Sequence, residues 1–367
     1  MKRKSNQSVC FSIIGHKNTY WYTFDLSTEG GDGRISVPCR CDCGCSCAKR
    51  IRYDTTGGTP FLSPTKFLPL KDRYDPGWTV MGNQLYLLGG TTRNKKDLKE
   101  VTRTVRALDL TRSTATESSS NGGGNYTRGW QRKPRMIVPR RRSQAIVLGG
   151  KLYVFGGPGV DDDDAPWAEV YDPISNTWEA LPQPPEGFGY GFLSASLKDD
   201  NDEEKGSVVL FQHGKVMEYH VANKCWSMTE LPDSVYHAIN DDKILHGPTV
   251  AIGRMFYWFC METCRLHGLH LDTHILHTSD VMIDIPSVLC GCDYKPMLGY
   301  LGGHKFFLLH EDYDRYKTRK QTGTTLIHCL KFSVDLVARK KWLDFSLESS
   351  QSFVIKAPYM MNDCFVM

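Results

Sequence analysis

The sequence lacks any long apolar run. The apolar residues after the basic N-terminus are too few for the core of a signal peptide, and no later stretch is long enough to span a membrane. We therefore expect a cytoplasmic or nuclear protein without a membrane partner. The 13 cysteines of this 367-residue chain are expected to stay reduced, because disulfide frameworks belong to small secreted domains.

The chain also has little net charge and no familiar nucleophile motif. A formal net charge of +4 is too small to indicate a nucleic-acid partner by itself. The G-x-S-x-G pattern, which places a nucleophilic serine on a sharp turn, is absent from the sequence. These absences favour a non-catalytic protein.

The sequence does contain one clear meander of short strands, at residues 140–185. Residues 143–148 and 152–155 are mainly apolar, partly β-branched or aromatic, and bounded by glycine, which is typical of buried strands. Gly156 and Gly157 allow a sharp backbone turn. Two further strands follow, one ending in a Tyr-Asp pair before a proline turn and one opening near a tryptophan.

This order of apolar strand, diglycine, Tyr-Asp strand and Trp resembles the kelch repeat. The resemblance implies an all-β, kelch-type β-propeller of four-stranded blades, with the diglycine on the second strand and the Tyr and Trp packed against neighbouring blades. The residues that carry the blade pattern are Gly89, Gly90, Gly156, Gly157, Tyr171, Asp172, Trp178 and Trp226.

We expect a single propeller of six blades over residues 1–367. Residues 9–14 and 20–26 begin the first blade, and a strand at 352–361 is expected to complete it and close the ring. Residues 363–367 also resemble a strand, which leaves open an added edge or another blade count. Third strands are expected to end at Asp25, Asp109, Asp172, His220, Asp272 and Phe332.

The later blades match the kelch pattern less well. His213-Gly214 replaces the diglycine of the fourth blade, and Gly302-Gly303 lies in an earlier turn of the sixth. The fifth lacks both the diglycine and the Trp, and its fourth strand is expected at 281–285. A Cys/Gly-rich insertion at 27–64 and a flexible Ser/Gly loop at 111–128 interrupt the blades.

Two groups of residues could bind metal. Alternating thiolates in the insertion can converge on Zn²⁺ or Cu⁺, although structural zinc sites usually pair cysteines about two to four residues apart; this group is Cys39, Cys41, Cys43, Cys45 and Cys47. The second group is Cys260, Cys264, His267, His270, His274 and His277, where the gap before the first His is far shorter than the ~12 residues of a zinc finger. An exposed insertion and structural histidines are the favoured interpretations, and no cofactor is expected.

Charged segments have alternative interpretations as well. Asp161 to Asp164 lack the ligand spacing and glycine of a calcium loop, so a solvated loop is favoured. Residues 128–142 hold seven Lys or Arg and could bind nucleic acid or act as a nuclear localisation signal. Because Pro139-Arg140 before a strand is also typical of the start of a kelch blade, a structural role is favoured there.

Two classes of kelch protein, catalytic and ubiquitin-linked, bear on the function. Plant nitrile-forming specifier proteins resemble this architecture, but their Glu-x-x-x-Asp-x-x-x-His iron site is absent, and a galactose-oxidase-like copper site would need a secreted chain with added domains. An unrecognised site in the propeller channel is the enzyme alternative that is left. The chain resembles plant F-box/kelch-repeat proteins, yet no F-box is expected, since the third strand of the first blade is complete by Leu26.

The predicted function is protein–protein interaction through the loop faces of a monomeric propeller. Any link to ubiquitination would then run through another chain. Metal binding by the Cys-rich insertion is the alternative. Arg and aromatic side chains concentrate binding energy at interfaces, so the candidates for exposed or rim positions that contact a protein partner are Arg140, Arg141, Arg142, Tyr153, Trp167, Tyr190 and His246.

Overall fold

The computed structural model shows an all-β chain. It describes residues 8–14, 19–26, 35–37, 49–52, 61–62, 66–68, 73–93, 99–110, 130–158, 165–185, 192–198, 206–212, 214–233, 235–236, 249–260, 263–283, 296–311, 325–336, 342–355 and 361–366. The named elements within these ranges are all β-strands. None of these residues belongs to a helix long and apolar enough to cross a membrane.

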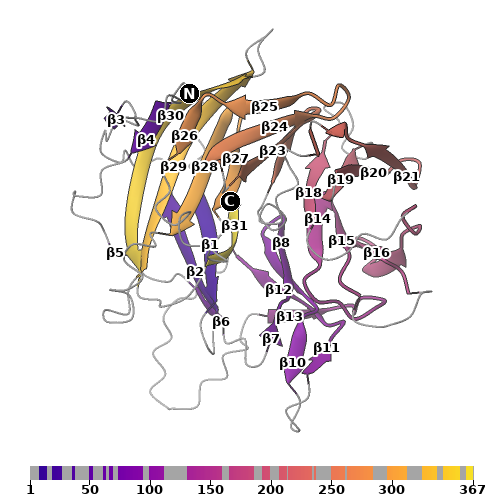
Figure 1. Ribbon diagram of the computed structural model, residues 1–367. Helices are drawn as coiled ribbons and strands as arrows, with labels where there is room; N and C mark the ends of the chain where they lie inside the picture. Colours follow the sequence, from indigo (N-terminus) through magenta and orange to yellow (C-terminus); the bar gives the residue numbers. More distant parts are fainter. Residues whose placement is uncertain are drawn as a thin grey trace, which may run out of the picture. The chain divides into compact units, whose positions relative to one another are not determined.

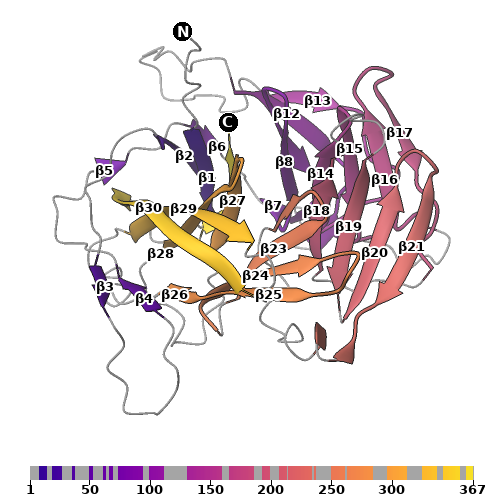
Figure 2. The same cartoon turned by 90° about the horizontal axis from the view of Figure 1, so that it is seen from above.

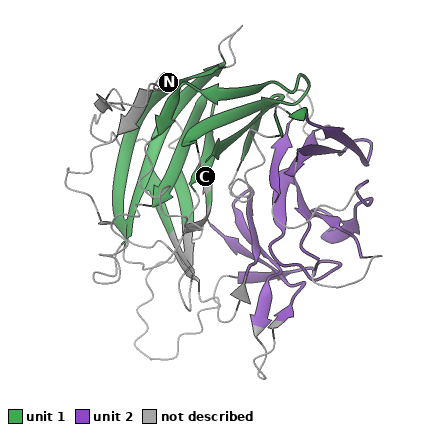
Figure 3. Ribbon diagram, in the orientation of Figure 1, with its two compact units in different colours: residues 1–67, 232–367 green, residues 68–231 purple. Residues whose placement is uncertain are grey.

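The chain divides into two compact units, which are described separately (Figure 3). Unit 2 covers residues 68–231, and unit 1 combines residues 1–67 with 232–367. Within the described residues each unit contains three four-stranded arrangements of strands, numbered here as blades 1 to 6 in chain order. Six blades of the kelch type were predicted, and this fold class is confirmed.

Unit 2 holds blades 2, 3 and 4 (Figure 1). Blade 2 consists of β8 (Gly77–Met81), β9 (Gln84–Leu88), β12 (Val105–Asp109) and β13 (Trp130–Lys133). Blade 3 consists of β14 (Gln144–Leu148), β15 (Lys151–Phe155), β16 (Ala168–Asp172) and β17 (Thr177–Ala180). Blade 4 consists of β18 (Leu193–Leu197), β19 (Ser207–Gln212), β20 (Lys215–His220) and β21 (Cys225–Glu230). A small sheet joins β7 (Arg73–Tyr74), β10 (Thr91–Arg93) and β11 (Lys99–Val101).

The burial of each strand follows its place in the blade. Blade 3 packs one face against blade 2 and the other against blade 4, and Figure 2 shows blades 3 and 4 side by side. Its second strand, β15, is buried on both faces, which explains its continuous apolar run, whereas the fourth strand, β17, is mostly exposed and polar. The same gradient separates β19 from β21 in blade 4.

Unit 1 holds blades 5, 6 and 1. Blade 5 consists of β22 (Val250–Ile252), β23 (Met255–Cys260), β24 (Arg265–His270) and β25 (Leu276–Ser279). Blade 6 consists of β27 (Met297–Gly302), β28 (Lys305–Glu311), β29 (Thr325–Leu336) and β30 (Trp342–Ile355). Blade 1 joins β31 (Met361–Val366), β1 (Ser8–Ile14), β2 (Thr19–Asp25) and β6 (Lys66–Leu68) in that order.

The C-terminal strand completes blade 1, but it is not the strand that was expected. The prediction of 352–361 is wrong, because residues 352–355 end β30 and already pair with β29, as in Thr325 opposite Ile355. Their backbone groups are therefore occupied. The strand that pairs with β1 is β31, with Val9 opposite Val366.

Blade 5 also differs from its prediction. Its fourth strand is β25, not residues 281–285. The cause is a tight turn after β24, in which the backbone N–H of His274 donates to the carbonyl of His270 at 2.8 Å, so that the chain returns at once with Leu269 opposite Leu276. Residues 281–283 instead form β26 (Val281–Ile283), which pairs with β4.

The Cys/Gly-rich insertion contributes strands that its composition did not indicate. β3 (Ile35–Val37) and β4 (Lys49–Arg52) form a sheet with β26. β5 (Phe61–Leu62) pairs in parallel with the end of β30. The outer strand of blade 1 is β6, which follows the insertion and pairs with β2. Residues 111–128, predicted to be a flexible loop, lie outside the described ranges.

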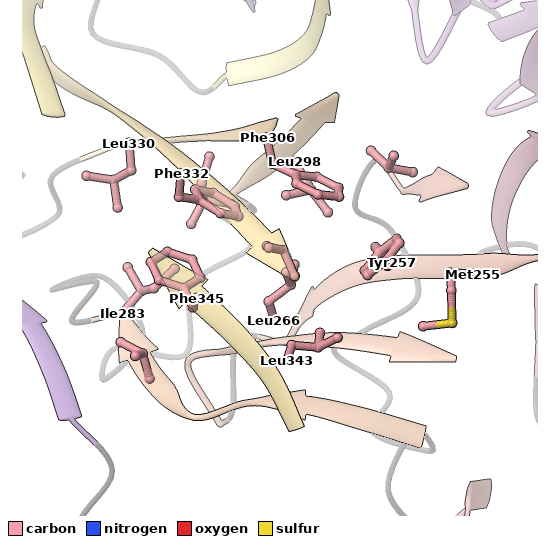
Figure 4. Close-up of a cluster of buried hydrophobic side chains, with 14 residues drawn as sticks. Met255, Tyr257, Leu266, Ile283, Leu298, Phe306, Leu330, Phe332, Leu343 and Phe345 are labelled. Atoms are coloured by element: carbon pink, nitrogen blue, oxygen red, sulfur yellow. The ribbon is translucent and has the colours of Figure 1, made fainter. Parts of the chain in front are cut away.

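Blades 5 and 6 are joined by strand pairing as well as by packing. β25 pairs in parallel with β30, with Thr278 opposite Trp342. Between the two blades lies an apolar cluster (Figure 4), in which Tyr257 of β23 meets Phe306 of β28 at a ring-centroid distance of 5.2 Å. Phe306, Phe332 and Phe345 continue as a stack with centroid distances of 5.7 and 4.5 Å.

Candidate interaction surface

Arg140 connects blade 2 to blade 3. Its backbone binds blade 2, since Gly90 N–H donates to the Arg140 carbonyl at 2.7 Å. Its side chain binds blade 3: Nε donates to Glu169 Oε1 at 2.7 Å, and Nη1 donates to the carbonyls of Gly156 and Trp167 at 2.8 Å. Burial lowers the pKa of the guanidinium, and the Glu169 carboxylate opposes that shift. Arg140 therefore stabilises the junction between the blades.

Glycine corners allow the chain to pass close to this junction. Gly157 has φ +64°, and a Cβ there would lie 2.0 Å from the carbonyl oxygen of Arg141. Gly89 has φ +58°, and its Cβ would lie 2.3 Å from the carbonyl oxygen of Arg140. No side chain fits at such distances, so there is a steric reason for glycine just after the second strand of each of these blades.

The Tyr and Trp of the pattern serve the same packing role in two blades. The rings of Tyr171 and Trp178 lie 5.2 Å apart in blade 3, and those of Tyr219 and Trp226 lie 5.0 Å apart in blade 4. The indole N–H of Trp178 donates to the carbonyl of Pro134, in the segment that leads into blade 3. Trp226 makes the equivalent bond to Pro182 before blade 4.

Asp172 forms the turn between β16 and β17. Its Oδ1 accepts the backbone N–H of Ile174 at 2.8 Å, and its Oδ2 lies 3.1 Å from Lys151 Nζ. The Ile174 N–H and then Lys151 lower the pKa of this carboxyl. The Asp of the blade pattern is therefore explained by a turn that needs an ionised acceptor.

Three of the predicted partner-binding residues are buried. Arg140 is 0% exposed, Tyr153 3% and Trp167 9%, so their predicted exposure is wrong. Tyr153 lies between blades 3 and 4, with its ring 6.3 Å from that of Tyr219, and burial raises its pKa to about 12. Trp167 packs on Phe192 at 5.5 Å. Arginine and large aromatic side chains are suited both to an exposed binding surface and to a buried blade junction. The residue type alone therefore does not tell the two positions apart.

The other predicted residues are exposed or lie outside the described ranges. Arg141 and Arg142 are exposed at the start of blade 3. Arg142 Nε lies 3.2 Å from Asp75 Oδ2, and the Arg141 backbone N–H donates to the Gly157 carbonyl at 2.8 Å. Tyr190 and His246 are outside the described ranges, as are Asp161 to Asp164.

Further exposed arginines lie at the same end of blade 2. Arg132 and Arg135 come from the basic run that the sequence showed, and both are exposed. Arg103 is exposed as well, and its carbonyl accepts the backbone N–H of Met136 at 3.0 Å. Arg103 and Arg106 were not singled out from sequence, because no local pattern relates residues before the 111–128 segment to the basic run after it.

The Cys and His residues of blade 5 point in different directions. His267 is buried, stacks on Trp258 at 5.5 Å, and has its ring nitrogens 3.0 and 3.1 Å from the hydroxyls of Thr263 and Thr278. Burial lowers its pKa to about 4. His277 is on the opposite face, across from Gly268. Among the residues described, no group of three or more His, Cys, Asp or Glu could hold a metal ion; Cys39 to Cys47 lie outside them.

Known proteins match part of this chain. The family model of the kelch motif matches residues 139–185. An F-box/kelch-repeat protein of Arabidopsis thaliana is 39% identical over 103 residues, which are 28% of this chain and 25% of that protein. A putative F-box/kelch-repeat protein of the same plant is 32% identical over 125 residues, 33% of this chain and 28% of that protein. The chain thus spans about a quarter of the length of the curated relatives it matches.

A solved structure is similar to this chain over most of its length. The structure of YjhT aligns with a TM-score of 0.49 at 11% identity, over 94% of this chain and 98% of that chain. The family match, by contrast, falls on blade 3 and the segment leading into it. The predicted resemblance to kelch-repeat proteins is confirmed by the family match and by the names of the relatives.

Proposed function

Taking the chain as a kelch-type propeller, we propose that it is a non-catalytic protein-interaction module that binds a partner at the diglycine ends of blades 2 and 3. The observation that carries the proposal is the contrast between Arg140, fully buried and bonded to both blades, and the exposed Arg141 and Arg142 that follow it. Binding sites are commonly built from exposed side chains on loops that a rigid scaffold holds in place.

The assembly in which the module acts is proposed by analogy. The matched relatives are named F-box/kelch-repeat proteins, and kelch repeats generally serve protein interaction. In this proposal the chain is the substrate-recognition part of a ubiquitin ligase, in the cytoplasm or the nucleus.

Affinity purification with mass spectrometry tests the proposal. Tagged wild type is compared with Arg141→Glu, which reverses the charge at the diglycine end, and with Lys198→Glu, the same change at an exposed residue after β18. The wild type and the Lys198 variant should retain a specific partner that the Arg141 variant loses, and a cullin in the eluate would support the ubiquitin link. Equal recovery by all three excludes this surface, and no specific partner for any of them excludes the module.

Metal binding is the second candidate, carried by the alternation of Cys39 to Cys47. The metal-to-protein ratio of the wild type is measured beside a variant with these five cysteines changed to serine. Zinc or copper bound by the wild type alone, together with no specific protein partner, would favour the metal function over the adaptor.

A further inference from the structure

Four arginines of blade 2 gather where its two outer strands meet the diglycine end. Arg106 on β12 lies directly opposite Arg132 on β13. Arg103 precedes β12. Its carbonyl accepts a hydrogen bond from the backbone N–H of Met136, the residue after Arg135. Arg103, Arg132 and Arg135 are exposed and Arg106 is half-buried. These four residues are called the arginine patch.

The patch is electrostatically unfavourable on its own. Directly opposite residues of an antiparallel pair share a face, and like charges there destabilise the sheet. The carboxylates at the neighbouring junction are taken: Glu169 binds Arg140, and Asp75 lies against Arg142. Within the described ranges, no ion pair involves any of the four arginines. Their positive charge is therefore available to a ligand.

The chemistry of the patch suits carboxylates. A guanidinium offers a planar fork of donors that binds carboxylate or phosphate oxygens in bidentate fashion, so adjacent arginines favour a ligand with closely spaced anionic groups. Two observations disfavour a nucleic acid. The chain carries a net charge of only +4, and Trp130, the aromatic ring beside the patch, already lies against Trp78 at 6.5 Å instead of standing free to stack on a base.

We infer that the arginine patch docks an acidic segment, rich in Asp and Glu, of the partner protein. This inference rests on the proposed function, since it specifies the chemistry of the partner at the same end of blade 2. The directly opposed Arg106 and Arg132 form its centre, and Arg103 and Arg135 extend it toward the diglycine end.

The test uses a fluorescently labelled peptide of alternating Glu and Gly, titrated with the full chain and followed by anisotropy. In Arg132→Glu the opposed pair becomes Arg106 and a glutamate, a favourable cross-strand pair, so the melting temperature should stay unchanged or rise while the peptide affinity falls roughly tenfold or more, as expected for about 1.4 kcal/mol of lost binding. Lys198→Glu makes the same charge change elsewhere in unit 2 and should bind like the wild type. Higher salt should weaken binding by the wild type.

Several results would overturn the inference. The first is that the wild type does not bind the peptide, and the second is that Arg132→Glu binds it as tightly as the wild type. The third is that the wild type binds a single-stranded oligonucleotide more tightly than the peptide and that Arg132→Glu loses this binding. Partner recovery separates this inference from the proposed function. If Arg132→Glu keeps the partner that Arg141→Glu loses, the arginine patch is wrong and the interaction module stands. If no variant recovers a partner, the module itself fails.

Discussion

The junction between blades 2 and 3 and the junction between blades 5 and 6 solve the same packing problem differently. The first is held by glycine corners and by the buried pair of Arg140 and Glu169. The second is held by the parallel pairing of β25 with β30 and by the stack of Phe306, Phe332 and Phe345. Where strand pairing joins the blades, a corner residue is not needed. The kelch pattern is clear in blade 3, at the polar junction, and faint in blades 5 and 6, at the apolar one.

The largest effect is expected from breaking the polar junction. Glu169→Ala leaves the guanidinium of Arg140, which is 0% exposed, without its carboxylate, and loss of one partner of a buried ion pair costs about 3–5 kcal/mol. Urea unfolding measures this cost. A loss below about 1 kcal/mol for Glu169→Ala, the range of exposed pairs, would contradict the role given to the pair.

A similar loss, by another mechanism, is expected at the apolar junction. Phe332 is fully buried between two other rings, so Phe332→Ala should lower the free energy of unfolding by about 3–5 kcal/mol. Phe332→Leu is the control, because it keeps most of the volume and should cost less. The loss of stability in Phe332→Ala should add to the loss in Glu169→Ala, since Phe332 and Glu169 share no partner. Strong coupling between them would mean that the two junctions are not independent.

A further effect is expected in acid from His267 of blade 5, which lies on the face of β24 opposite to Leu266 and so points away from the apolar junction. This buried histidine has a pKa of about 4 in the folded chain against 6.5 as its ordinary value. The unfolded state therefore binds a proton at higher pH, and stability is full above about pH 6.5 and falls as the pH drops toward 4, by about 3 kcal/mol at most. The variant His267→Gln cannot take up this proton. Between about pH 6.5 and pH 4 it should therefore lose up to about 3 kcal/mol less stability than the wild type. Parallel curves of wild type and variant would refute the assignment.

The smallest expected effect is the difference in stability between alanine variants of two glycines that have a left-handed backbone conformation. Gly157 and Gly303 have φ +64° and +61°, but only Gly157 has close neighbours, while nothing lies within 4 Å of a Cβ at Gly303. Alanine in this conformation costs roughly 1–2 kcal/mol at either site. Gly157→Ala should cost about 1–3 kcal/mol more, the usual penalty of overpacking. Thermal melts of the two variants measure the difference, and equal melting temperatures would show that the corner can relax.

Much of blade 3 could be predicted from the sequence because its requirements are local. A diglycine, a Tyr-Asp turn and a Trp lie within one meander, and the structure gives each a short-range reason: steric contact at Gly157, hydrogen bonds at Asp172, and a ring contact at Trp178. The candidate site was predicted less well. Arg140 and Arg141 are neighbours of the same type, yet one is buried and the other exposed, and residue type does not distinguish them.

The sequence by itself determined the strand order, the all-β class and the positions of most turns, since these depend on glycine, proline and short apolar runs. Only the tertiary structure decided which strand completes blade 1 and which arginines reach solvent. It also placed Arg106 opposite Arg132. The physical reason is that these outcomes depend on which distant backbone groups and side chains are already occupied, as when β29 takes residues 352–355 and leaves β31 to pair with β1.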